Sequence, residues 1–571
     1  MFSLRLLLTL FIGLNLLAFL VFFINSSLNQ KKIKLVATDY SNNYQFLNPD
    51  IAFHVLEQLD IPKAPFAPEK PKGTFLGLKR DSEYCRKVRA QFVRNTYSLF
   101  QEINFLCDYL SHSLMRSILP QIGTDTMPRL SFQLPKSVRS TPTFDIPLNV
   151  STIFTNKALH GTYFLFGKEL VCLTQSYNHI PGISLLNRKD KVASCVFNYT
   201  QKYKNKPQCF DGNKFFPRTW LLDNPDQCRD WFEIINSPHY QEEKQKKVVV
   251  YIRKLGAGGH QGKGVEPVGE IEEAKLRKTY QNGKKCGAVK NTYIVQSYIH
   301  NPLLVMGHKF DFRVYLLIAS TNPLIAYYHD GFLRVSLLEY DVSRTEKGMH
   351  LTNTAQSLKV IKQAKADGIS EEELMNFQMW NYTRLANYLI EKGRIKRLSW
   401  IDEYLRPAFH HAMQHLVRMT QSKYYKHSAV WELFGVDFML DEELNLWFIE
   451  CNSGPALKAS NEEKRVMLTK MLKDQFEIIA GLLRSRVKRV VKYVNWLMSN
   501  NLVKVDSDTA GNVSVKIEKY ELRRKEFEDL LRNRFEEEFE VSSDNNWKKI
   551  VDENIEGLGR YNGNIKTECF D

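Results

Sequence analysis

One stretch of the chain, residues 431–457, constrains the fold and the chemistry more than any other. It consists of two apolar runs, 433–440 and 446–451, on either side of an acidic turn at 441–443. Apolar runs of this length around a short polar turn are typical of a β-hairpin. We therefore expect two paired strands here, with the acidic residues of the turn at one end.

Polar residues inside these two runs suggest a metal site. A strand alternates its side chains, so we expect Phe448, Glu450 and Asn452 on one face, with Asp437 opposite Glu450 to within one residue. Carboxylate and amide oxygens are the ligands that Mg²⁺ accepts beside nucleotide phosphates. A surface hairpin with solvated acids is the alternative. The apolar residues around Asp437 and Glu450 favour the metal site, because charged residues among them need partners.

Charge and cysteine content narrow the class of protein. The chain has 571 residues, enough for two to four domains, and a net charge of +16 that favours an anionic partner. Nucleic acid, a membrane surface, a nucleotide and an acidic protein all qualify. The nine cysteines include no CxxC pair, so we predict neither a zinc site nor a disulfide framework. This favours a reducing compartment.

The amino terminus contains an apolar run at residues 6–24, long enough to span a bilayer. It is long for a signal peptide, so a membrane anchor at residues 1–30 is favoured. One basic residue, Arg5, precedes the run and three lysines follow it, which places the body of the chain in the cytosol. Glycosylation sequons at Asn149, Asn198, Asn381 and Asn512 would argue for the opposite orientation, but such triplets are common by chance.

The remaining sequence divides into three parts. Residues 31–150 are expected to be a linker with irregular and helical segments, including a helix over 85–119. From there to residue 480, short strands alternate with helices, which indicates an α+β enzyme. Residues 481–571 are expected to form a basic and then mixed-charge helical extension.

A glycine-rich loop follows a short strand at 248–252. Lys254 ends that strand, and Gly262, Lys263 and Gly264 belong to the loop behind it. Glycine backbone can approach phosphates closely while lysine neutralises their charge, so the loop is a candidate phosphate cradle. It is neither a Walker A nor a Rossmann motif, and a flexible linker is the alternative.

A third candidate lies on the strand predicted at 309–318. Lys309, Asp311 and Arg313 alternate with apolar residues and therefore share one face. A solvated face with a local salt bridge would explain them, but the apolar continuation indicates a central strand whose charges need partners or ligands. Arg334 lies on the next predicted strand. Together with the hairpin, these residues describe a site for a triphosphate and a second anion.

In combination, these segments resemble the tubulin tyrosine ligase-like family of the ATP-grasp fold. The matching motifs include NHIPG with RKD at 178–190, GHQGKGV, KFDFRVYLL, HLTN and FGVDFMLDEELNLWFIECNSGP, in family order. The resemblance implies an ATP-grasp fold whose two antiparallel sheets grip ATP. Its lobes would be amino-terminal (151–225), central (226–335) and carboxy-terminal (336–480).

The resemblance also assigns roles to individual residues. It implies that ATP is bound by Lys254, Gly262, Lys263, Gly264, Gln296, Tyr298 and Asn353. It implies that substrate carboxylate and phosphate charge are held by Lys309, Asp311, Arg313 and Arg334. It implies that Mg²⁺ is bound by Asp437, Glu450 and Asn452.

The implied activity is ATP-dependent ligation of a free amino acid to a protein carboxylate, activated as an acyl phosphate. Such a step needs positioning and charge neutralisation, which magnesium and the lysine and arginine set supply. Tubulin or another acidic protein is the expected acceptor, and glutamate is the favoured amino acid. We expect a microtubule-associated monomer with no nucleic-acid partner.

Two other functions compete with the ligase. A catalytically silent scaffold could tether microtubules to a membrane, whereas a luminal glycosyltransferase leaves the lysine-glycine loop unexplained. A helix near residue 490 bears directly on tubulin binding. Its basic residues could form a surface for acidic tails or the solvated face of a cap; they are Arg484, Arg486, Lys488, Arg489 and Lys492.

Overall fold

The computed structural model describes most of the chain, in several segments. These are residues 44–60, 80–96, 100, 102–107, 129–133, 148–154, 172–180, 182–206, 212–247, 249–256, 264–289, 293–341, 343–344, 347–352, 361–362, 368–457, 459, 461–507 and 513–555. The predicted anchor at 6–24 and three predicted site residues, Gly262, Lys263 and Asn353, lie outside the described residues. Among the described helices, none combines the length and the apolar character needed to cross a bilayer.

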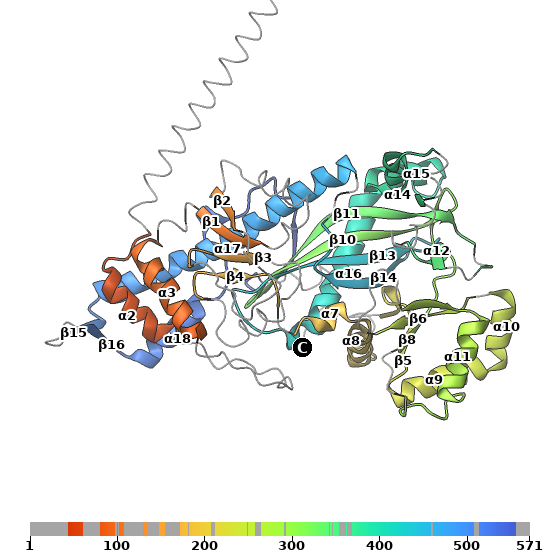
Figure 1. Cartoon of the computed structure of the whole chain (residues 1–571), viewed down its shortest axis with the longest axis horizontal. Helices are drawn as coiled ribbons and strands as arrows, with labels where there is room; N and C mark the ends of the chain where they lie inside the picture. The colour runs from red at the N-terminus through yellow and green to blue at the C-terminus, as the bar shows by residue number, and fades with distance from the viewer. Residues whose placement is uncertain are drawn as a thin grey trace, which may run out of the picture.

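The centre of the molecule is a seven-stranded antiparallel sheet (Figure 1). Its strand order is β12-β11-β10-β13-β14, with β17 paired to β11 and β9 paired to β10. The strands are β9 (Leu304–Val305), β10 (His308–Thr321), β11 (Leu324–Glu339), β12 (Met379–Trp380), β13 (Glu432–Leu440), β14 (Leu446–Ser453) and β17 (Lys548–Asp552). The predicted α+β class and the predicted hairpin at 433–451 are confirmed.

Alternation along β10 determines which face of this sheet is covered by helices. Phe310, Phe312 and Val314 pack into a buried cluster with α15 (Tyr382–Glu391) and α16 (Arg406–Thr420). On the opposite face, Tyr315 and Leu317 pack against α17 (Glu462–Ser499). Lys309, Asp311 and Arg313 share that second face, but they lie on the first half of β10, which precedes the part that α17 covers. The sheet therefore carries a charged area beside a fully apolar one.

A smaller antiparallel sheet forms the central lobe, whose bounds differ from the predicted 226–335. Its first strand precedes that range, and β10 and most of β11 within the range belong to the main sheet. The strand order of the smaller sheet is β5-β8-β6-β7, and helices cover this sheet on one side (Figure 1). The strands are β5 (Thr219–Leu221), β6 (Tyr251–Leu255), β7 (Val265–Val268) and β8 (Tyr293–Ser297). The helices are α9 (Pro225–Asn236), α10 (Pro238–Lys246) and α11 (Glu270–Tyr280). The molecule thus contains the two antiparallel sheets that the motif resemblance implied.

The region before residue 150 differs from the sequence-based expectation. The helix predicted at 85–119 is α3 (Arg80–Arg94), and a strand, β1 (Glu102–Cys107), follows it. Strand β1 pairs in parallel with β2 (Arg129–Gln133) and β3 (Thr152–Phe154), and β3 pairs with β4 (Ser176–Tyr177). Short apolar runs do not distinguish strand from helix by periodicity alone, which explains the error. The expected linker therefore supplies two strands of a sheet that continues past residue 151, together with α2 (Pro49–Leu59) and α3.

The region after residue 480 also differs from expectation. Helix α17 begins well before that boundary, and a hairpin of β15 (Val503–Ser507) and β16 (Val513–Ile517) follows it. Helix α18 (Tyr520–Leu530) comes next, and β17 then joins the main sheet beside β11. The predicted helical extension is therefore wrong in part, because its last strand completes the sheet that carries the candidate site.

The basic residues of α17 have a role that the sequence did not predict. Arg486 is buried and donates hydrogen bonds to the carbonyl oxygens of Leu173, Gln175 and Ser428. Arg489, also buried, donates to backbone carbonyls in the segment 530–534. These arginines join distant segments of chain to α17. Both predicted alternatives, a surface for acidic tails and a solvated cap, are therefore wrong for them.

Two disulfides contradict the prediction from the cysteine pattern. Cys85 of α3 is bonded to Cys172, and Cys228 of α9 is bonded to Cys286. The partners are 87 and 58 residues apart in sequence. Spacing rules detect nearby cysteine pairs, so pairs made by tertiary packing escaped them.

Candidate active site

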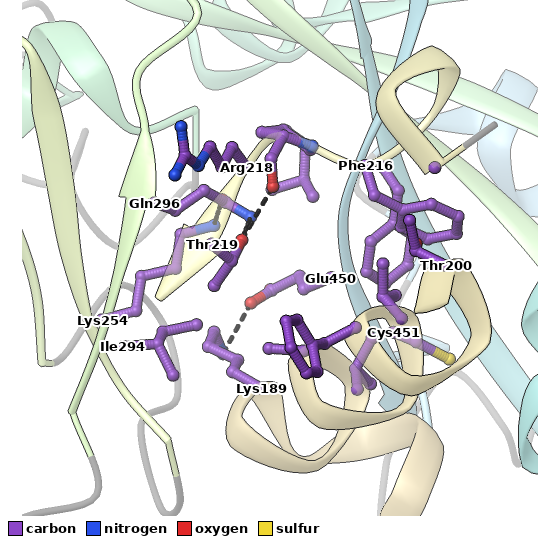
Figure 2. A pocket seen from close by; sticks show the side chains of 18 of the residues that line it. Lys189, Thr200, Phe216, Arg218, Thr219, Lys254, Ile294, Gln296, Glu450 and Cys451 are labelled. Atoms are coloured by element: carbon purple, nitrogen blue, oxygen red, sulfur yellow. Dashed lines mark hydrogen bonds and ion pairs between the residues drawn. The ribbon is translucent and has the colours of Figure 1, made fainter. Parts of the chain in front are cut away.

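A cavity of about 150 Å³ opens between the central lobe and the main sheet (Figure 2). Strands β6 and β8 supply Lys254, Ile294 and Gln296 on one side, and β14 supplies Glu450 on the other. Helix α8 (Lys189–Lys202) closes a third side and contributes Lys189. The cavity combines apolar walls with a few convergent charges, the usual character of a small-molecule site.

Lys254 begins a chain of hydrogen bonds along the central lobe. Its Nζ donates to Gln296 Oε1 at 2.6 Å, and Gln296 Nε2 donates to Thr219 Oγ1 at 2.9 Å. Pairing of β5, β6 and β8 brings these three residues together. Burial, with the nearby charge of Lys189, lowers the pKa of Lys254 to about 8. Its ammonium donates to a neutral partner and is positioned to bind an anion in the cavity.

Glu450 forms the opposite wall through an ion pair with Lys189. The Lys189 Nζ lies 2.8 Å from Glu450 Oε2, and Asn452 Nδ2 donates to Glu450 Oε1 at 3.2 Å (Figure 2 shows the ion pair). Burial acts to raise the pKa of Glu450, but the charge of Lys189 and these hydrogen bonds outweigh it and lower the pKa to about 2. Glu450 is therefore a carboxylate at any physiological pH.

Local structure explains the position of Lys189. Helix α8 begins at this residue, after a four-residue helix α7 (Ser184–Asn187). Asp190 lies in its first turn and is held by Arg188, whose Nη2 is 2.6 Å from the carboxylate. Acidic residues stabilise this end of a helix because its free N–H groups are partly positive. Val192 is buried against the main-sheet core, which turns Lys189 towards the cavity.

The β13–β14 register confirms one prediction and corrects another. Asp437 pairs with Glu450, as predicted. A bulge lies between that pair and the next, in which Phe438 pairs with Phe448. A bulge adds one residue and so shifts the alternation of side chains. Phe448 consequently packs with Cys451 in the core beneath, and the predicted shared face for Phe448 and Glu450 is wrong.

Four charged residues interlock on the polar half of the main sheet. Arg313 donates to both oxygens of Asp437, at 2.5 and 3.0 Å. Arg334 donates to Asp311 at 2.5 and 2.7 Å and to Asp437 at 2.7 Å. The strand register brings these residues together, because β10 pairs with β11 on one side and with β13 on the other. Ion pairs this buried need such complete hydrogen bonding to offset their desolvation.

Gly435 provides the space that the Arg313 side chain occupies. It lies two residues before Asp437 on β13, on the same face of the strand. A Cβ atom at Gly435 would be 2.9 Å from the Cδ and 3.1 Å from the Nε of Arg313. The glycine thus allows the guanidinium to lie flat along β13 and reach the carboxylate.

Lys309 occupies a separate position on the same face. Its Nζ donates to the Tyr298 hydroxyl at 3.0 Å and lies 4.7 Å from the centre of that ring. The Tyr298 hydroxyl is also 2.6 Å from His350 Nδ1. Burial is the main cause that lowers the pKa of Lys309 to about 7, and the charge of Lys254 acts in the same direction. Tyr298, expected near an adenine, thus has its hydroxyl directed at Lys309.

The oxygen donors present suit a magnesium ion. Asp437 receives three hydrogen bonds from arginines and keeps roughly one of about four lone-pair positions. Glu450 keeps more lone-pair positions than Asp437, and Asn452 adds an amide oxygen. In the described part of the chain no three residues among His, Cys, Asp and Glu gather closely enough for a metal site. Asn452 would therefore have to complete the set, as the sequence indicated.

The predicted site residues fall into two neighbouring groups. Lys254, Gln296 and Glu450 line the cavity, whereas Asp311 and Arg334 lie in the neighbouring network. The sequence missed three residues that complete these interactions. Lys189 pairs with Glu450, Thr219 ends the hydrogen-bond chain from Lys254, and Thr352 donates to Asp311 at 2.5 Å. The RKD motif at 188–190 included Lys189, but its pairing with Glu450 became visible only in the tertiary structure.

Fold and site together define a class. Two antiparallel sheets that enclose a cavity lined by lysines and a carboxylate form an ATP-grasp-like arrangement. A model of the tubulin-tyrosine ligase family matches residues 168–487, more than half of the chain. This chain belongs to the tubulin-tyrosine ligase family.

Curated relatives are similar over part of their length. Tubulin glycylase 3A of Drosophila melanogaster is 32% identical, over 34% of this chain and 19% of the relative. Protein polyglycylase TTLL10 of Macaca fascicularis is 30% identical, over 44% and 39%, respectively. Tubulin polyglutamylase TTLL7 of Mus musculus is 27% identical, over 52% and 31%. The chain thus spans less than half the length of these relatives.

Proposed function

We propose that this protein is an ATP-dependent ligase that joins a free amino acid to a carboxylate of tubulin or another acidic protein. One observation carries the proposal: a cavity places Lys254 and Lys189 opposite the carboxylate of Glu450. Lysines facing an ionised carboxylate suit a magnesium-bound triphosphate, because cations bind the phosphates and the acid binds the metal. The arginine network beside the cavity would hold the acceptor carboxylate.

The first chemical step would activate that carboxylate. One of its oxygens attacks the γ-phosphorus of ATP, the bond to the β,γ-bridging oxygen breaks, and ADP leaves. The product is an acyl phosphate. Lys254 and Lys189 would stabilise charge on the phosphates, and Mg²⁺ held by Asp437, Glu450 and Asn452 would supply further neutralisation. No nucleophilic side chain is required.

The second step would form the new bond. The neutral α-amine of the incoming amino acid attacks the acyl carbon, inorganic phosphate leaves with its electron pair, and the amine loses a proton to solvent. Lys309, Arg313 and Arg334 would hold the carboxylates of the two substrates. Positioning the reactants in this way removes much of the entropic barrier to a bimolecular reaction.

Glutamate is the amino acid we propose, ahead of glycine. Its relatives carry the names of tubulin glutamylases and glycylases, so names alone do not choose. Lys309 hydrogen-bonds to a neutral phenol, and its charge is positioned for a second carboxylate. Glutamate has that carboxylate and glycine lacks it. A side-chain carboxylate bound by a buried ammonium would contribute about 1.5–3 kcal/mol of discrimination.

The test is mass spectrometry of tubulin after incubation with the full chain, Mg-ATP and an equimolar mixture of glutamate, glycine and tyrosine. Glutamate addition that requires ATP is the expected result. Glu450→Gln should abolish it, because the variant keeps the side-chain shape and loses the charge. Glu443→Gln is the matched control, since Glu443 is exposed in the turn of the same hairpin. No addition of any amino acid, to tubulin or to other acidic proteins, would refute the proposal.

A silent scaffold is the second candidate. One relative, 26% identical over 48% of this chain, is named "Inactive polyglycylase TTLL10" of Homo sapiens. A scaffold would bind microtubules equally well with and without the Glu450→Gln substitution and would consume no ATP. Co-sedimentation of the wild-type and substituted proteins with microtubules, alongside the incorporation assay, separates the two functions.

A further inference from the structure

We propose that the body of this chain folds in an oxidising, glycosylating compartment, where Asn149 carries an N-linked glycan. Two kinds of observation support it independently: the paired cysteines and the position of one sequon. The inference concerns covalent modification of the chain and stands apart from its catalytic activity.

The first cross-link joins two regions that pack closely around it. Cys85 and Cys172 have their Cα atoms 5.3 Å apart, within the range that a disulfide spans. The neighbouring residue Tyr84 accepts a hydrogen bond from Gln175 Nε2 at 2.9 Å. Helix α3 is thus held against the segment before β4 by packing as well as by the bond. The native fold itself brings these thiols together.

The second cross-link lies in the central lobe, between α9 and the segment that follows α11. Cys228 of α9 is fully buried, and Cys286 lies in the segment 281–289 that follows α11, with Cα atoms 5.7 Å apart. That segment is built of successive turns, with positive φ at Gly283 and Gly287. It has little regular structure of its own, so the bond to α9 fixes it. Two such bonds in one chain are characteristic of oxidising compartments and rare in a reducing cytosol.

The sequon at Asn149 is suited to modification. Asn149 is exposed in a turn immediately before β3, while the next two residues, Val150 and Ser151, are buried. A glycan there would extend from the surface without displacing a packed side chain. Loops and turns of secreted proteins are the usual sites of N-glycosylation.

The two other described sequons lie in or at the start of a helix. Asn381 caps α15 by accepting from the Arg384 N–H at 2.7 Å, and its Nδ2 donates to Glu463 at 2.5 Å. Asn198 is exposed on α8, but its neighbours Phe197 and Thr200 line the cavity. Asn149, which lies in an exposed turn outside any helix, is therefore the acceptor we assign.

This assignment reverses the orientation that the charges around residues 6–24 predicted. It also bears on the acceptor: a body in that compartment would modify an acidic protein there rather than cytosolic tubulin. That consequence, unlike the rest of the inference, rests on the proposed ligase function.

The test uses the full chain expressed in eukaryotic cells and denatured directly in an alkylating reagent without reductant. Mass spectrometry should find peptides joined through Cys85–Cys172 and Cys228–Cys286. Cys195 and Cys451, which are free thiols in the structure, are internal controls and should be alkylated. Alkylation of all six residues would overturn the inference.

Glycosylation is read on the same preparation. An N-glycosidase should reduce the mass of the wild-type chain, and this shift should be lost in Asn149→Gln and retained in the control Asn381→Gln. Disulfides without a glycan at residue 149 would overturn the assignment of Asn149. Free thiols in an active ligase would refute this inference alone, whereas disulfide-bonded protein without ligase activity would refute the proposed function alone.

Discussion

Replacing Lys254 by methionine tests the phosphate-binding role of the cavity directly. Lys254 is 5% exposed and donates to Gln296 Oε1 at 2.6 Å, so methionine of similar length removes the charge with little change in packing. A hydrogen bond to a charged group contributes about 1.5–3 kcal/mol. The dissociation constant of ATP should therefore rise roughly 10- to 150-fold. Equilibrium binding of Mg-ATP to the folded protein measures it.

The pH dependence of that binding provides a second, independent measurement. The pKa of Lys254 is about 8 in the free protein, so at pH 9 only about a tenth of the molecules carry its charge. Between pH 6 and pH 9 the wild-type protein should lose about tenfold more ATP affinity than Lys254→Met. Titration of ATP itself affects both proteins and cancels in the comparison. Removing the charge of Lys254 raises the pKa of Lys309 in the variant, which keeps Lys309 charged to higher pH and so acts in the same direction as the expected difference.

The matched control is Lys191→Met, which removes the same charge from a position on α8 that is exposed. It should leave the affinity within about twofold of wild type, because a surface charge contributes little. If Lys254→Met binds ATP as tightly as Lys191→Met, or shows the same pH profile as wild type, the phosphate-binding role is refuted.

Three further substitutions test the other contacts. Lys189→Met should lower the thermal midpoint at pH 7. Because the pKa of Glu450 is depressed to about 2, the ion pair stabilises the folded state above about pH 4.5 and ceases to do so towards pH 2. The difference in thermal midpoint between the variant and wild type should therefore shrink over that range. Gly435→Ala should displace Arg313 and reduce kcat at least tenfold while circular dichroism stays unchanged. Cys228→Ser should cost about 4 kcal/mol, since the bond closes a loop of 58 residues, and Cys195→Ser should not; equal thermal midpoints for these two variants would contradict the cross-link.

Local patterns were sufficient for the hairpin and for the alternation of polar residues on β10. Residues 433–440 and 446–451 formed the predicted strands, and Asp437 paired with Glu450. The hairpin and the alternation on β10 depend only on residues that are close together in the sequence, so both can be predicted from it. The bulge beside Glu450 was not predictable, because every residue around it is compatible with a regular strand.

The partners of charged residues were decided by tertiary structure. Arg334, Asp311 and Asp437 were each singled out from the sequence, but their shared hydrogen bonds follow from β11, β10 and β13 lying side by side. The pairing of Lys189 with Glu450 likewise joins residues more than 250 positions apart. A sequence specifies which ionisable side chains are present, but not the distances between them, and those distances determine their pKa values and their partners.

Contacts between distant parts of the chain show the same difference between what the sequence and the tertiary structure determine. The sequence by itself determined the family motifs between residues 178 and 455, because the spacing of polar side chains on short strands is a local property. Only the tertiary structure decided that β17 completes the main sheet, that Arg486 is buried rather than exposed, and that Cys85 meets Cys172. Each of those contacts closes a long stretch of chain, and its stability comes from packing that forms only when the whole domain has folded.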